Sequence, residues 1–94
     1  MSQTTQIEFT MQIWREGVQF IAHAMPLDVM SSGKTPEDAK KALDEAVSLF
    51  LRTAEEMGTL TDVLLESGYK WENGQWACPS WVAVEKRYMA IGAY

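Results

Sequence analysis

The N-terminal third of the chain alternates between apolar and polar residues. Apolar side chains occupy every second position from Ile7 to Ile13, which is the period of a half-buried β-strand. A second alternating segment runs from Val18 to Ala24, and Glu16-Gly17 supplies a tight turn between the two. A shorter segment, Leu27 to Ser31, follows Pro26. We therefore predict a three-stranded antiparallel meander with one covered and one solvated face.

The pattern changes to a helical period after the third predicted strand. Thr35 can cap the free amides of a helix, and Pro36 loses nothing at the first helical position because it has no amide to satisfy. Apolar residues then recur every three or four positions as far as Met57, where Gly58 provides a stop. The same signals repeat on a smaller scale, so a short second helix is predicted over residues 60–67.

The C-terminal quarter returns to β-forming residues. Asn73-Gly74 lies between Trp71 and Trp76, and this dipeptide is the strongest short signal for a hairpin. Such a hairpin sets the two indoles opposite each other. From Trp81 to Ile91 the chain is rich in aromatic and β-branched residues, which favours a fourth strand. A helix that begins at Ser80 is the alternative.

Composition and length fit a single α+β domain. The chain has 94 residues, of which 47% are hydrophobic and 22% are charged, as in ordinary globular proteins. We predict one domain over residues 1–94 with the order βββα(α)β, in which one long helix packs on one face of an antiparallel sheet and residues 1–6 are loosely held. No apolar run is long enough to cross a membrane, and we expect no secretory leader, because residues 1–6 are polar and carry no cationic stretch. Together with a lone cysteine, Cys78, this predicts a cytoplasmic protein.

The formal net charge of -5 is concentrated in the middle of the chain. Nine of the 13 acidic residues lie between Glu37 and Glu72, against four basic residues. No basic cluster is present to neutralise phosphates, so the charge argues against nucleic acid and favours a basic protein partner. Simple solubility is the competing explanation. The candidate partner-binding residues, on the predicted outer face of the long helix, are Asp44, Glu45, Glu55 and Glu56.

Few residues follow the pattern of a catalytic or metal site. His23 is the only histidine and Cys78 the only cysteine, and neither has metal-ligand spacing around it. A metal-dependent nuclease, which we keep as an alternative, would have to bring together the strand acids Glu8, Asp28 and Glu85. We expect no catalytic residue, no cofactor and no metal, and therefore a protein that is not an enzyme.

Aromatic residues gather near the C-terminus. Six of them lie in the last 26 residues, more than a small domain easily buries, and Trp and Tyr are favoured at protein interfaces. We therefore expect a homo-oligomer, a dimer or a tetramer, and the exposed edge of a small sheet offers it a further contact. The candidate interface residues are Trp71, Trp76, Trp81 and Tyr88.

The segment that joins the third predicted strand to the helix resembles that of the HicB family. In that family a small residue and a glycine precede Thr-Pro-Glu-Glu-Ala at the helix entry. Here Asp38 replaces the second Glu, which keeps the capping chemistry. The resemblance covers residues 7 to about 68. The motif positions in this chain are Gly33, Thr35, Pro36, Glu37, Ala39 and Ala46.

HicB proteins are antitoxins of bacterial and archaeal HicA–HicB pairs. The resemblance therefore implies a partial, degenerate RNase H-like fold and a non-catalytic role, which is to bind and cover a small basic ribonuclease toxin of the HicA type. The motif marks fold positions and supplies no catalytic residues. Family members that repress their own operon add a DNA-binding module, and the residues after Gly68 do not resemble one. We expect no direct DNA binding. The alternative is a solitary homo-oligomeric protein of the same fold with another partner.

Overall fold

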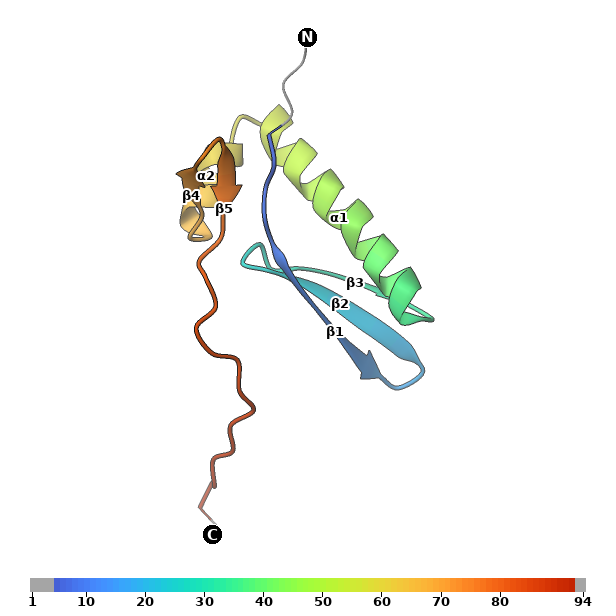
Figure 1. Cartoon of the computed structure of the whole chain (residues 1–94). Coiled ribbons are helices and arrows are strands. Elements are labelled where there is room, and N and C mark those ends of the chain that lie inside the picture. Colours follow the sequence, from blue (N-terminus) through green and yellow to red (C-terminus); the bar gives the residue numbers. More distant parts are fainter. Residues whose placement is uncertain (1–4, 93–94) are drawn as a thin grey trace.

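The computed structural model describes residues 5–92 and has the predicted α+β architecture (Figure 1). A three-stranded sheet is followed by a long helix, a short helix and a two-stranded hairpin. In the described range, no helix has the length and apolar character that a membrane span requires. Residues 1–4, most of the segment predicted to be loosely held, lie outside the described part. The elements are β1 (Thr10–Glu16), β2 (Gln19–Met25), β3 (Val29–Gly33), α1 (Pro36–Glu56), α2 (Leu60–Glu66), β4 (Lys70–Glu72) and β5 (Gln75–Ala77).

The first three strands form the predicted antiparallel meander in the order β1-β2-β3. The first and third strands begin later than the alternation indicates. Ile7 pairs instead in parallel with Trp76 of β5, so the regular β1 ladder starts only at Thr10. Leu27 is buried in the loop before β3, and Asp28 has a φ of 60°, a left-handed conformation that turns the chain and is not compatible with a strand.

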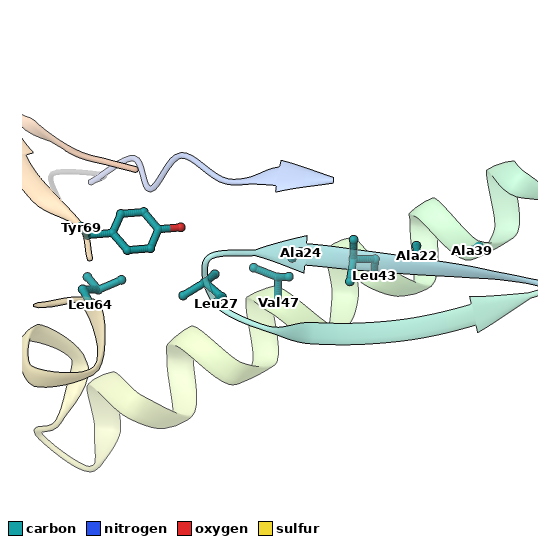
Figure 2. Close-up of a cluster of buried hydrophobic side chains, with 8 residues drawn as sticks. All are labelled: Ala22, Ala24, Leu27, Ala39, Leu43, Val47, Leu64 and Tyr69. Atoms are coloured by element: carbon teal, nitrogen blue, oxygen red, sulfur yellow. The ribbon is translucent and has the colours of Figure 1, made fainter. Parts of the chain in front are cut away.

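Helix α1 lies across β2 and β3 because small residues face it. Ala22 and Ala24 of β2 and Ala39 of α1 are completely buried (Figure 2). A Cβ at Gly33 would lie 2.5 Å from the backbone nitrogen of Ala39, so the closest approach of helix and sheet requires glycine. The predicted cap is confirmed, since Thr35 Oγ1 accepts a hydrogen bond from the Asp38 backbone amide at 3.0 Å.

The core continues from the sheet to the second half of the chain. Leu43 and Val47 of α1 fill the space above β2, and Leu27, Leu64 and Tyr69 extend the cluster toward α2 and the hairpin (Figure 2). This one cluster joins all the elements except the far end of the chain.

The Asn-Gly hairpin is confirmed and is attached to the N-terminal segment. Asn73 and Gly74 have φ values of 51° and 77°, as a tight two-residue hairpin turn requires. The backbone amide of Trp76 donates to the Gln6 carbonyl at 3.0 Å, and the amide of Glu8 donates to the Trp76 carbonyl at 3.0 Å. The hairpin is therefore fixed by main-chain bonds to residues 6–8.

The predicted fourth strand from Trp81 to Ile91 is wrong, and the alternative helix from Ser80 is not formed either. From residue 79 to residue 92 the chain has no regular secondary structure and runs away from the body (Figure 1). It gives the protein a long dimension of 61 Å against 30 and 23 Å. The residue types are those of a strand, but a strand also needs a neighbouring edge, and the segment leaves the sheet just after Trp81.

Candidate functional site

The four acidic residues predicted to bind a partner lie on one side of α1. Asp44 and Glu45 precede Glu55 and Glu56 by eleven positions, which is about three helical turns or roughly 16 Å. Each residue of the first pair therefore points in nearly the same direction as its counterpart in the second. All four are exposed. We call them the acidic face.

The acidic face is not neutralised by the basic residues of the same helix. Lys40, Lys41 and Arg52 have helical spacing to acids four positions away, yet within residues 5–92 no Lys or Arg side chain forms an ion pair with a carboxylate. The four carboxylates therefore present their charge to solvent. A surface of this kind attracts a basic partner over about a Debye length, roughly 8 Å at physiological salt.

A cleft borders the C-terminal end of the acidic face. Its volume is about 540 Å³. Its lining includes Arg52 and Glu55 of α1, Leu60 of α2, and Trp71 and Trp76 of the hairpin. The structure thus brings a predicted partner-binding carboxylate next to two predicted interface tryptophans. We call this hollow the tryptophan cleft.

The two tryptophans form a defined aromatic wall. They are cross-strand partners in the hairpin, and their ring centroids lie 5.3 Å apart with the ring planes at 70°, an edge-to-face arrangement. Trp71 is 54% exposed, whereas Trp76 is half-buried and packs on the core. The backbone bonds of Trp76 to residues 6 and 8 hold the wall in place.

The tryptophan cleft suits a cationic side chain of a protein partner. An indole face attracts a Lys or Arg side chain, most strongly when water is excluded, and Glu55 adds a carboxylate to the lining. Arg52 adds a positive charge, so the lining carries one charge of each sign. The net acidity of the region comes from the neighbouring acidic face.

A hydrogen-bonded group around Glu8 joins the N-terminal segment to the end of the hairpin. The Cys78 thiol donates to Glu8 Oε1 at 3.0 Å, and the Tyr69 hydroxyl donates to the Glu8 carbonyl oxygen. Burial, followed by the hydrogen bond to Glu8, raises the pKa of the Cys78 thiol. Burial is also the main reason why the pKa of Tyr69 is raised. The thiol is therefore positioned as a hydrogen-bond donor to Glu8, and its raised pKa disfavours the thiolate form.

The remaining candidate chemistry is dispersed. His23 lies 2.6 Å from Asp28 and packs edge-on against Trp14, while Cys78 bonds to Glu8. Glu85 lies on the exposed segment beyond the hairpin. Throughout residues 5–92, no three His, Cys, Asp or Glu side chains gather as metal ligands would. The structure therefore does not bring together the three acids of the nuclease alternative.

The four predicted interface residues do not form one patch. Trp71 and Trp76 line the tryptophan cleft. Trp81 is 50% exposed, and its indole donates to Thr10 Oγ1 at 2.9 Å. Tyr88 is 90% exposed in the extended segment.

Sequence reasoning missed two surface features. One is the cleft itself, because nothing in a local pattern shows that the hairpin folds back toward Arg52 and Glu55. The other is a groove of about 410 Å³ between α1 and α2, lined by apolar residues that include Leu49 and Met57. Leu49 lies outside the arc of α1 that faces the sheet and is 61% exposed. An apolar residue on the outer side of a helical wheel is therefore the sequence signal that could have indicated the groove.

Comparison with protein-family models, with curated proteins and with solved structures finds no match to this chain.

Proposed function

We propose that this protein is a non-catalytic binding module, a HicB-like antitoxin that binds and blocks a small basic ribonuclease toxin in the prokaryotic cytoplasm. The observation that carries the proposal is the position of the acidic face directly beside the tryptophan cleft. The motif from Gly33 to Ala46 that resembles the HicB family supports it. The three antiparallel strands followed by a long helix are compatible with the first part of the fold that the resemblance implies.

The two parts of the surface have different physical roles in this proposal. The acidic face increases the rate of encounter with a basic protein, an effect that salt weakens. The tryptophan cleft provides the anchor, because interface energy concentrates in desolvated aromatic pockets that accept a few side chains. Inhibition then follows from covering the toxin, and this protein contributes no chemical step and no direct DNA contact.

Co-expression with the product of the neighbouring gene tests the proposal. The expected gene encodes a short, Lys- and Arg-rich protein with a single histidine. We expect this protein to retain growth-arresting activity alone, to lose it on co-expression, and to co-purify with the present chain. If no small basic protein is encoded nearby, and none co-purifies, the antitoxin proposal is wrong.

Matched charge variants locate the surface. Glu55→Lys reverses a charge at the junction of the acidic face and the tryptophan cleft, whereas Glu66→Lys makes the same change at the exposed end of α2. We expect Glu55→Lys to slow association and to flatten its dependence on salt, and Glu66→Lys to leave both nearly unchanged. If the two variants have equal effects, the acidic face is not the binding surface, and only the overall charge of the protein affects association.

The second candidate function is a solitary homo-oligomer, a dimer or a tetramer, that binds another partner. The observation that favours it is the exposed apolar segment at the C-terminal end, where Val82, Tyr88 and Met89 are each at least 90% exposed. Stable self-association without a co-purifying basic protein would support this alternative over the antitoxin.

A further inference from the structure

The segment from Trp81 to Ile91, here called the tail, is largely apolar. Its first residues, 81–83, share a hollow with Met25 and Pro26. No residue of the tail belongs to the core or to the apolar side chains packed on it. Its apolar residues are 50–98% exposed. A soluble protein rarely leaves this many large apolar side chains of one short segment in water. Those residues are Trp81, Val82, Val84, Tyr88, Met89 and Ile91.

The same chain has an unpaired sheet edge. Strand β1 lies at the edge of the sheet and pairs only with β2 over Thr10–Glu16. Its other side meets the tail of its own chain at one point, where the Trp81 indole binds Thr10 Oγ1. After that contact the tail leaves the sheet (Figure 1). In the described part of the chain, no strand pairs with the outer side of β1 from Met11 onward.

The apolar side chains along this edge are incompletely covered. Helix α1 lies over β3 and β2 and scarcely reaches β1. Met11 is only partly buried, and Ile13 is 36% exposed although its position faces the helix side of the sheet. An added strand beside β1 would cover these side chains and pair the free main-chain groups at the same time.

We propose that the tail of one copy adds as a strand to the outer edge of β1 in a second copy, and that the exchange is reciprocal. The dimer is then closed by a two-fold axis, and neither tail nor edge remains unpaired. This inference rests on the self-association named in the second candidate function and goes beyond the antitoxin proposal. It concerns the protein without any toxin, so its failure is distinguishable from a failure to bind one.

The composition of the tail and the area of its apolar surface favour a second copy of this chain as its binding partner. The tail has the aromatic and β-branched residues of a strand, and the only partner that certainly carries a matching free edge is the same chain. Each tail has six large exposed apolar side chains, so two exchanged tails offer an area within the roughly 1,200–2,000 Å² of a stable interface.

The molar mass of the isolated protein tests the proposal first. Light scattering during gel filtration is expected to give twice the chain mass of 10.6 kDa. Val84→Asp and Tyr88→Asp place a charge in the added strand and are expected to give monomers with an unchanged circular dichroism spectrum, because neither side chain belongs to the core. Glu85→Gln, at a polar position of the same segment, is the matched control and is expected to remain a dimer.

Cross-linking between two labelled populations identifies the contact. In a Cys78→Ser background, one population carries Ile13→Cys and the other carries Tyr88→Cys. A bifunctional maleimide added to the mixture is expected to give a covalent heterodimer. A full-length chain that is monomeric, a dimer that survives both aspartate variants, or cross-linking that occurs only when both cysteines are on one chain would overturn the proposal.

Discussion

The substitution Gly33→Ala tests the packing on which the fold depends. Gly33 ends β3 directly beneath the first turn of α1. A Cβ at this position would lie 2.5 Å from the Ala39 backbone nitrogen, 2.7 Å from the Asp38 carbonyl carbon and 2.8 Å from the Asp38 Cβ. Two of these three atoms belong to the backbone and cannot rotate away, so the helix entry has to move.

The expected cost follows from two opposing effects. Overpacking a well-packed site costs about 1–3 kcal/mol. Replacing glycine by alanine also lowers the conformational entropy of the unfolded chain, which stabilises the folded protein by about 0.4–1 kcal/mol. The net loss for Gly33→Ala is therefore about 1–2 kcal/mol, which lowers Tm by roughly 4–16 °C in a domain of this size.

Urea unfolding monitored by circular dichroism measures this loss. Gly92→Ala is the matched control, because no atom lies within 4 Å of a Cβ there and its φ is not in the left-handed region. We expect the control to stay within about 0.5 kcal/mol of the parent protein. If Gly33→Ala is as stable as Gly92→Ala, the close approach of β3 and α1 is wrong.

Further substitutions test the cap, the core and the buried thiol. Thr35→Ala removes the helix cap and is expected to cost about 1 kcal/mol in urea unfolding, with Thr35→Ser close to the parent. Leu43→Ala opens a cavity in the completely buried core and is expected to cost about 2–5 kcal/mol in the same assay. Alkylation of Cys78 at pH 8 is expected to be slower in the folded protein than in urea and faster in Glu8→Gln, because burial and the Glu8 bond raise the pKa of the thiol; equal rates in all three would contradict this. The free energy of unfolding is expected to fall as pH rises above 9.0, the ordinary pKa of the thiol, since the unfolded chain then releases protons that the folded Cys78 and Tyr69 retain; a flat alkaline profile would contradict it.

The local elements could be predicted from the sequence because local chemistry determines them. Thr35 caps the helix, and Asn73-Gly74 turns the hairpin, as expected. The bounds of a strand differ from the prediction where a residue far away in the sequence pairs with its end. Ile7 alternates with the first strand but pairs with Trp76, some 70 positions later in the chain, and no local period contains that information.

The conformation of the tail and the position of the tryptophan cleft could not be predicted, because both depend on contacts between segments that are far apart in the sequence. The residues from Trp81 to Ile91 favour a strand, but whether a strand forms depends on an available edge, and this chain alone does not place one beside the tail. The cleft depends on how the hairpin lies against α1. Charge and aromatic content indicated Glu55, Trp71 and Trp76 as separate candidates, and only the fold places them around one hollow.

Binding of the small basic toxin that we propose as the partner tests the central claim most directly. The affinity of the purified toxin is measured by calorimetry for the parent protein, for Trp71→Ala and Glu55→Lys in the cleft, and for Glu66→Lys on α2. We predict at least a tenfold loss for Trp71→Ala, a loss for Glu55→Lys that shrinks as salt increases, and no change for Glu66→Lys. Absence of binding to the parent protein, or affinities that both cleft substitutions leave unchanged, would contradict the account.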